Sequence, residues 1–222
     1  MIEYKENKDI IARRIARIFK SGDVVNLGIG LPTLVGNYVP DDVTVVLQSE
    51  NGMLGLGPAP APDKVDPDLC NAGGQPVTIE AGGCFFDSAT SFAIIRGGHV
   101  DYTVLGVLEV DQDGNLANYK IPGKMVPGMG GAMDLTAGSR VVIAATTHFE
   151  KNGSSKLKRH CALPLTALKQ VNLVVTDLGF FEVMGGKFFL LEWFRPYTVE
   201  WIIEHTDAEV VHLSNCRCSD LD

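Results

Sequence analysis

Short apolar segments, rich in β-branched residues, alternate early in the chain with segments that have the spacing and caps of helices. The apolar segments lack polar alternation, as strands do when layers cover both faces of a parallel sheet. We therefore predict an α/β fold with three layers, in which an open, mainly parallel sheet lies between helices on both faces. Strands are expected at residues 23–27, 43–47, 102–108, 140–145, 172–176 and 209–213.

Apolar residues at i, i+4 and i+7 predict an amphipathic first helix that ends near Gly22. Arg13, Arg14 and Arg17 lie between these apolar positions and are expected to form the solvated face. A long irregular loop is expected at residues 55–76, because this segment is rich in Gly, Pro and Ala. Further helices are expected after Pro32, at 88–95 and at 198–205, and hairpin turns at 111–115 and 184–186.

The composition limits the class of protein. We predict one domain at residues 1–215 and a polar tail at 216–222, because 222 residues make a single domain the default. A net charge of −8 argues against nucleic acid or an anionic membrane as the main partner. Five scattered cysteines predict reduced thiols in a cytoplasmic protein. Cys216 and Cys218 lack a second Cys/His pair at ligand spacing, so no metal site is expected.

Glu50 directly follows one of the predicted strands, on a turn that contains Asn51 and Gly52. In open α/β sheets, ligands bind outside the carboxyl ends of the strands. A carboxylate at such a place acts as a general base, a metal ligand or a nucleophile. The alternative is a plain hairpin turn, for which Asn-Gly is a common signal. Candidates for a second acid beside it are Glu80, Glu109 and Asp134.

Two glycine-rich segments have the composition of ligand-binding loops. Gly28 and Gly30 follow a predicted strand, as the glycines of a phosphate-binding loop do, but the third glycine of the dinucleotide fingerprint is missing. Residues 128–131 would let a ligand approach the backbone, and their amides would stabilise an oxyanion. Taken separately, such glycines more often form ordinary turns than ligand-binding loops.

Taken together, the motifs resemble the active-site signature of class I coenzyme A transferases. Ser-Glu-Asn-Gly at residues 49–52, followed by Gly-Leu-Gly-Pro at 55–58, is similar to the B (β) subunit of 3-oxoacid and acetate–acetoacetate CoA-transferases. The resemblance also includes the motifs at residues 26–33, 71–74, 86–89, 95–99, 114–118, 121–124 and 128–135. It weakens after about residue 150.

The resemblance implies that Glu50 is the nucleophile of a ping-pong reaction. Its carboxylate would attack an acyl-CoA, and CoA would then form a covalent thioester with the same glutamate. CoA is in this case a substrate and part of the intermediate, and no tightly bound cofactor is expected. The donor and acceptor acids stay open among 3-oxoacids such as acetoacetate, acetate, succinate and butyrate.

The resemblance also implies roles for the other motif residues. The amide of Gly131, next to Gly130, would donate to the oxyanion, and Asn51 and Gly52 would aim Glu50. Two assignments stay open. Gly28 and Gly30 either shape the floor of the pocket or serve close packing. Lys124 either meets CoA phosphates or is a solvated loop lysine.

The fold implied is that of the CoA-transferases, which is related to the fold of sugar-phosphate isomerases. The chain has room for the B half only, so a separate A (α) subunit is expected, in an A2B2 heterotetramer with an apolar contact surface. The alternative is a non-catalytic module of the same fold that binds or senses small anions. Such a module has no need of a glutamate at position 50.

Overall fold

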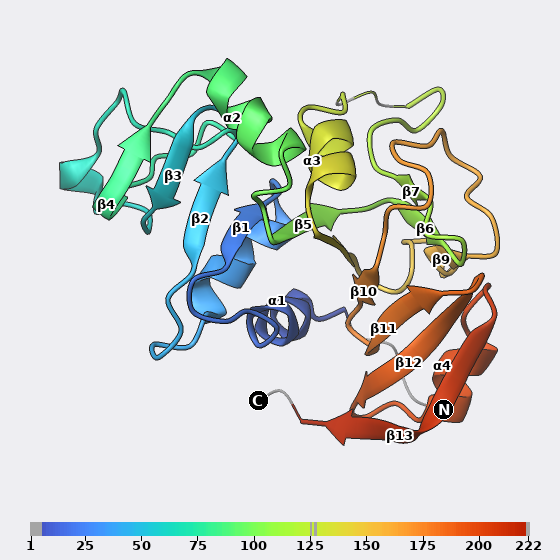
Figure 1. The fold of residues 1–222 in the computed structure, drawn as a ribbon. Helices are drawn as coiled ribbons and strands as arrows, with labels where there is room; N and C mark the ends of the chain where they lie inside the picture. The colour runs from blue at the N-terminus through green and yellow to red at the C-terminus, as the bar shows by residue number, and fades with distance from the viewer. Residues whose placement is uncertain (1–5, 125, 127, 221–222) are drawn as a thin grey trace.

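The computed structural model describes residues 6–124, 126 and 128–220, and two sheets organise them (Figure 1). The large sheet contains β1 (Val24–Leu27), β2 (Val46–Ser49), β3 (Met53–Leu56), β4 (Ile79–Phe85), β5 (Tyr102–Gly106), β8 (Val141–Ala145), β10 (Leu173–Val175), β11 (Gly179–Met184), β12 (Lys187–Phe194) and β13 (Val210–Ser219). The small sheet contains β6 (Glu109–Asp111), β7 (Leu116–Ala117) and β9 (Leu157–Lys158). The helices are α1 (Lys8–Ala16), α2 (Ser88–Arg96), α3 (Ala132–Gly138) and α4 (Val199–Glu204), with the 3-10 helices η1 (Leu31–Tyr38) and η2 (Pro62–Lys64).

The large sheet has the strand order β13-β12-β11-β10-β8-β5-β1-β2-β3-β4. Its middle five strands, from β10 to β2, are parallel, and antiparallel pairs flank them at both ends. From β1 the chain first adds β2 on one side and later β5 on the other. The crevice outside the carboxyl ends of β1 and β5 is therefore a topological switch point, the place where ligands bind in open α/β sheets.

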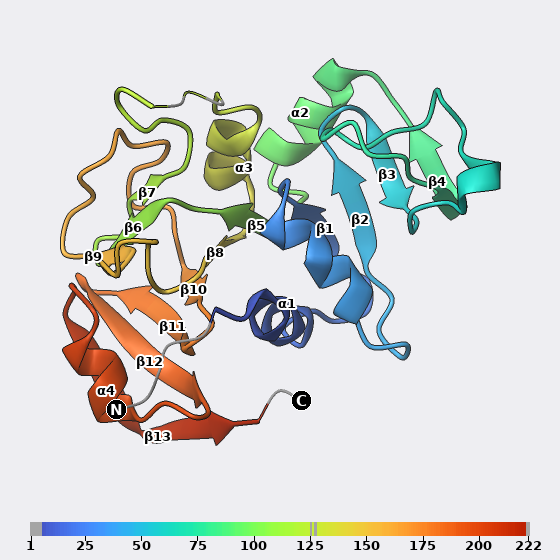
Figure 2. The ribbon, with the colours of Figure 1, turned by 180° about the vertical axis from the view of Figure 1, so that it is seen from behind.

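Helices cover both faces of the parallel strands, as predicted. On one face, Ile11 and Ile15 of α1 pack with η1 against Val25 of β1. On the other face, Ile95 of α2 and Leu135 of α3 pack in the core cluster that holds alternate residues of the same strands. Figure 1 shows α2 and α3 together on the side opposite α1. Both views place the small sheet beside the β11–β12 end of the large one (Figures 1 and 2).

Most predicted elements are present, with boundaries that differ by a few residues. The main errors concern β4 and α3. The segment expected as a loop begins with part of β3, and β4 follows it, although no strand was predicted there. β4 contains two glycines and is largely exposed, so it lacks the apolar alternation that identifies a strand. α3 is short and directly follows a glycine-rich segment, so its helical spacing is hard to detect.

The prediction that the arginines of α1 are solvated is wrong for Arg14. Its side chain is only 11% exposed, and its Nε donates to Oε2 of Glu192 in β12 at 2.5 Å. The guanidinium also lies 4.1 Å from the centre of the Phe180 ring. Helical periodicity could not predict this contact, because the strands that bury Arg14 come from the other end of the chain.

The C-terminal segment also differs from the prediction. β13 continues to Ser219 and pairs in parallel with β12, so residues 216–219 lie in a strand and not in a polar tail. The guanidinium of Arg217 and the hydroxyl of Ser219 both contact Glu192, which gives this polar segment a reason to join the sheet. All five cysteines are free thiols. In the described part of the chain, every helix is too short or too polar to cross a bilayer.

Candidate active site

Glu50 opens a tight turn between β2 and the antiparallel β3. Gly52 closes the turn, with its N–H donating to the Ser49 carbonyl at 3.0 Å. Its φ of +114° suits only glycine, and a Cβ at this position would lie 1.9 Å from the Phe86 carbonyl oxygen. The Asn-Gly hairpin signal and the placement of Glu50 after a strand are thus both confirmed, because the hairpin turn is what presents the carboxylate.

A row of buried polar side chains forms hydrogen bonds that orient the Glu50 carboxylate. Nδ2 of Asn26, in the neighbouring strand β1, donates to Oε2 of Glu50 at 3.0 Å and to Oε1 of Gln48 at 2.7 Å. Gln48 in turn donates from Nε2 to the Ser91 hydroxyl on α2 at 3.0 Å. Asn26, Gln48 and Ser91 are all buried. The row therefore orients one carboxylate oxygen through a neutral donor.

Asn26 and Gln48 are functional candidates that the sequence reasoning did not single out. The available signal was a polar residue inside each of two apolar strands, in Val-Val-Asn-Leu and Val-Leu-Gln-Ser. A buried polar side chain needs a hydrogen-bond partner, so each such residue indicates a buried network. Asn26 and Gln48 face each other across the β1–β2 register, which puts them in one row.

The second carboxylate oxygen faces the start of α3. Gly131 is the N-cap residue of this helix, and a Cβ there would lie 3.2 Å from Oε1 of Glu50. Among the described residues, no acceptor makes a hydrogen bond with the Gly131 N–H. The fold therefore brings Gly131 and Glu50 together, as the resemblance implied. Within the described residues, the Gly131 N–H is left without an acceptor at this place.

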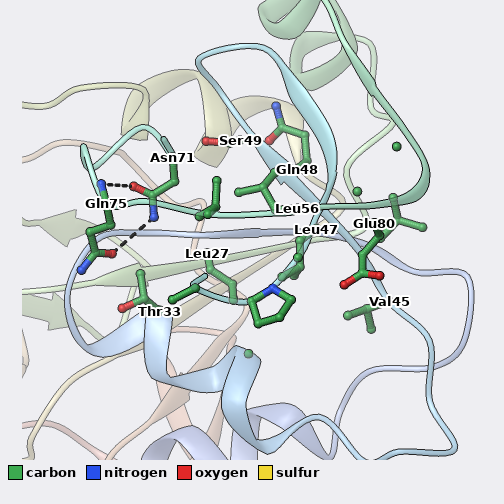
Figure 3. A pocket seen from close by; sticks show the side chains of 18 of the residues that line it. Leu27, Thr33, Val45, Leu47, Gln48, Ser49, Leu56, Asn71, Gln75 and Glu80 are labelled. Carbon is green, nitrogen blue, oxygen red and sulfur yellow. Dashed lines mark hydrogen bonds between the residues drawn. The ribbon is translucent and has the colours of Figure 1, made fainter. Parts of the chain in front are cut away.

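Glu50 lines a cleft of about 1220 Å³ whose walls are largely apolar. The end of the segment between β3 and β4 is tied to the Glu50 turn: the Ala72 N–H donates to the Ser49 hydroxyl at 3.0 Å, and Nδ2 of Asn51 donates to the Cys70 carbonyl at 2.8 Å. Figure 3 shows Asn71 hydrogen-bonded to Gln75 at one end of the cleft. Asn51 thus anchors the wall of the cleft.

The other predicted binding residues divide into two groups. Gly28 lines the cleft, and a Cβ there would lie 2.9 Å from the Val104 carbonyl oxygen, so it serves both the pocket and close packing. Gly30 begins η1 with a φ of +90°, in open space. Gly130 and Lys124 are exposed on the loop before α3. Within the described residues, Gly30, Gly130 and Lys124 do not line the cleft.

The three candidates for a second acid beside Glu50 lie in different parts of the structure. Glu80 lines the cleft, at the end near Val45 and away from Asn71 (Figure 3). Oε2 of Glu109 accepts hydrogen bonds from the N–H groups of residues 162 and 163, at 2.8 and 2.9 Å. Asp134 pairs with Arg96 at 2.6 Å. Across the residues that the structure describes, no three His, Cys, Asp or Glu side chains gather as metal ligands would.

Comparison with known proteins agrees with this geometry. The family model described as Coenzyme A transferase matches residues 8–204. The β subunit of the acetate CoA-transferase of Haemophilus influenzae is 56% identical over 204 residues, which cover 92% of this chain and 91% of that protein. The B subunit of a probable succinyl-CoA:3-ketoacid coenzyme A transferase of Bacillus subtilis is 49% identical over 205 residues, which cover 92% of this chain and 95% of that protein.

A solved structure supports the fold separately. The acyl-CoA transferase of Escherichia coli O157:H7 superimposes with a TM-score of 0.77 at 21% sequence identity, over 100% of this chain. This chain spans only 45% of that longer chain. The family model covers most of the sequence, and the relatives named as β or B subunits match it along nearly their whole length. The chain belongs to the coenzyme A transferase family, within the group of its β subunits.

Proposed function

We propose that this chain is the nucleophile-bearing β subunit of an enzyme that moves CoA between a short-chain acyl-CoA and a carboxylic acid. The observation that supports this best is the setting of Glu50. One oxygen of its carboxylate accepts a single hydrogen bond from Asn26, and the other lies beside the start of α3. A neutral donor orients the carboxylate without neutralising it, so its electron pairs stay available for attack.

The proposed reaction proceeds by two exchanges on Glu50. The carboxylate attacks the thioester carbonyl and expels CoA thiolate, which leaves a mixed anhydride between the acyl group and the glutamate. The thiolate then attacks the glutamyl carbonyl, forms the glutamyl-CoA thioester and releases the first acid as its carboxylate. A second carboxylate reverses both steps and departs as the new acyl-CoA, so no redox partner and no net water are needed.

The Gly131 N–H is the proposed donor to the negative oxygen that forms at each attack. It is a backbone donor without another acceptor in the described residues, next to the attacking group. One such donor contributes about 3 kcal/mol to lowering the barrier. The anhydride must also be kept from water, because hydrolysis would dissipate the thioester energy.

The rest of the site is proposed to come from an α subunit, in an A2B2 heterotetramer. The cleft that holds Glu50 is open in this chain, and its rim has exposed apolar side chains. Ile29 lines the cleft and is 67% exposed, and Met133, two residues after Gly131, is 53% exposed. Exposed apolar side chains beside a functional residue are typical of a surface that another protein covers.

The names of the relatives suggest two acid specificities, for acetate and for the succinate/3-oxoacid pair. We propose that the substrates of this chain come from the same class of short-chain acids, which includes acetoacetate and butyrate. Part of the wall that selects chain length would belong to the α subunit. The acid pair is therefore best found by testing acceptors on the assembled enzyme.

Intact-mass analysis tests the proposal directly. The chain is mixed with a CoA-transferase α subunit and acetoacetyl-CoA, without an acceptor acid, beside a matched Glu50→Gln variant. We expect the chain to gain the mass of CoA as a thioester on the peptide that contains Glu50, and the variant to gain nothing. Added acids should then discharge the adduct at rates that rank the acceptors. A complex that assembles but forms no adduct would favour the non-catalytic anion-binding alternative.

A further inference from the structure

A second cavity, of about 340 Å³, lies next to the Glu50 cleft. It is built at the carboxyl ends of β5 and β8, where Gly106 and Ala145 end their strands. Ile29, which follows β1, lines both this cavity and the Glu50 cleft. The cavity therefore lies beside the switch-point crevice between β1 and β5, which is the expected place for a ligand in this kind of sheet.

Lys156 is the half-buried charged residue of this cavity, and Glu6 and Lys8, which pair with each other, also line it. The Nζ of Lys156 donates to the Thr146 hydroxyl at 3.1 Å and to the Thr147 hydroxyl at 2.9 Å. Each hydroxyl donates its own hydrogen elsewhere, Thr146 to the Val107 carbonyl and Thr147 to the Phe149 carbonyl, so both act as acceptors toward the ammonium. An ammonium has three N–H donors, and these two threonines use two of them.

In the described part of the chain, the charge of Lys156 has no close counter-ion. Among the described residues, no carboxylate lies within ion-pair distance of its Nζ, and Glu6 at the cavity rim pairs with Lys8 at 3.3 Å. Burial lowers the pKa of Lys156, against the opposing influence of Glu6, Asp177 and Glu150. A bound anion would offset this cost of burying the ammonium.

The remaining walls indicate the chemical class of the anion. The apolar residues Ile29, Leu31, Val107 and Leu108 line the cavity together with Lys156 and the two threonines. Lys156 together with the paired Lys8 and Glu6 gives the lining a net charge of +1. A single positive charge beside apolar side chains suits a monoanion with a short hydrocarbon chain better than a phosphate dianion, which needs several donors. We propose that the Lys156 cavity is a second binding site, which takes a short-chain carboxylate.

The site links to catalysis through its position. Ile29 lines both this cavity and the Glu50 cleft, so the cavity would hold a short-chain acid beside the cleft before or after exchange at Glu50. This link rests on the proposed function, whereas carboxylate binding by itself does not. The link to catalysis predicts that the Lys156→Met variant still forms the glutamyl-CoA adduct. Its KM for the acceptor acid should be raised by at least about tenfold.

Ligand-observed NMR tests the binding on the full chain with its α subunit, without acyl-CoA. The probes are acetate and butyrate, the neutral butyramide, and inorganic phosphate. We expect saturable binding of the acids alone, weakened by at least about tenfold in Lys156→Met. Lys151→Met is the matched control, because it removes the same charge from an exposed position before the same strand and should bind as wild type does.

A second variant guards against a folding defect in Lys156→Met. Leu108→Trp fills the cavity with the charge intact and should also abolish acid binding. Butyrate binding to both variants within twofold of wild type would overturn the inference, and so would equal binding of butyramide or binding of phosphate alone. A wild-type enzyme that binds butyrate at this site but forms no Glu50 adduct would overturn the proposed function instead.

Discussion

The turn at Gly52 offers the sharpest test of how Glu50 is positioned. In Gly52→Ala, the new Cβ would lie 1.9 Å from the Phe86 carbonyl oxygen, where real Cβ contacts do not come under 3.0 Å. Phe86 is also hydrogen-bonded to the turn, because its N–H donates to the Gly52 carbonyl at 2.9 Å. The turn must therefore shift by about 1 Å or break this contact, and Glu50 lies two residues away.

We expect Gly52→Ala to lower both the stability of the fold and the rate of reaction, and different assays measure these two effects. An L-residue held at a φ of +114° carries strain on the order of 1–3 kcal/mol, which lowers the free energy of unfolding. A misplacement of about 1 Å at a reacting group lowers the rate by about 100-fold. We expect urea unfolding to report the first effect. Single-turnover formation of the glutamyl-CoA adduct, at saturating acyl-CoA and with the α subunit present, should report the second.

Gly22→Ala is the matched control. Gly22 has a φ of +93°, but a Cβ there meets nothing within 4 Å, and the residue lies in the turn between α1 and β1. It should show a similar loss of stability and a wild-type rate of adduct formation. A wild-type rate in Gly52→Ala would refute the idea that this turn aims Glu50. An equal rate loss in both variants would attribute the effect to general destabilisation.

Two further predictions concern buried polar groups. Asn26→Ala removes the donor to Glu50 and the donor to Oε1 of Gln48, so we expect stability lower by about 1–3 kcal/mol and adduct formation slowed by at least about tenfold. A rate within twofold of wild type would count against an orienting role. Burial, aided by His205, lowers the pKa of His148 to about 3. The unfolded chain takes up this proton below about pH 6.5, so unfolding free energy should fall by about 1.4 kcal/mol per pH unit from there toward pH 3. Urea titrations should show a shallower slope for His148→Asn.

The parts of the fold that the sequence predicted are those with local signals. The parallel strands follow from uninterrupted apolar runs, and α2 and α4 follow from caps whose side chains do bind the helix N–H groups, at Asp87 and Thr198. Arg14 was misjudged because its partner Glu192 is distant in the chain. Exposure of a helical arginine depends on which strands fold back over it, and spacing within the helix carries no such information.

In the candidate site, too, some features follow from local sequence signals and others do not. The position of Glu50 at the end of a parallel strand was predictable, because the apolar run before it is a local signal. The proximity of Glu50 to Gly131 came from the resemblance alone, since no spacing rule joins a turn after β2 to the start of α3. The sequence does not distinguish Lys156 from the other lysines of the polar stretch in which it lies. Only the packing of β5 and β8 shows that two threonine hydroxyls hold its ammonium at a cavity.

A comparison of three glutamates of this chain supports the proposal that Glu50 is the one that attacks. Glu192 is held by the guanidinium groups of Arg14 and Arg217, and Glu109 accepts two backbone N–H groups at one oxygen. Charged and multiple donors draw electron density from a carboxylate and stabilise its resting state, so both groups are well suited to structure and poorly suited to nucleophilic attack. Among the described residues, Glu50 accepts one hydrogen bond from a neutral amide, and its other oxygen lies beside Gly131, whose N–H makes no hydrogen bond there. The contacts that make the first two carboxylates good anchors are thus missing at the third, which supports its proposed role as the nucleophile.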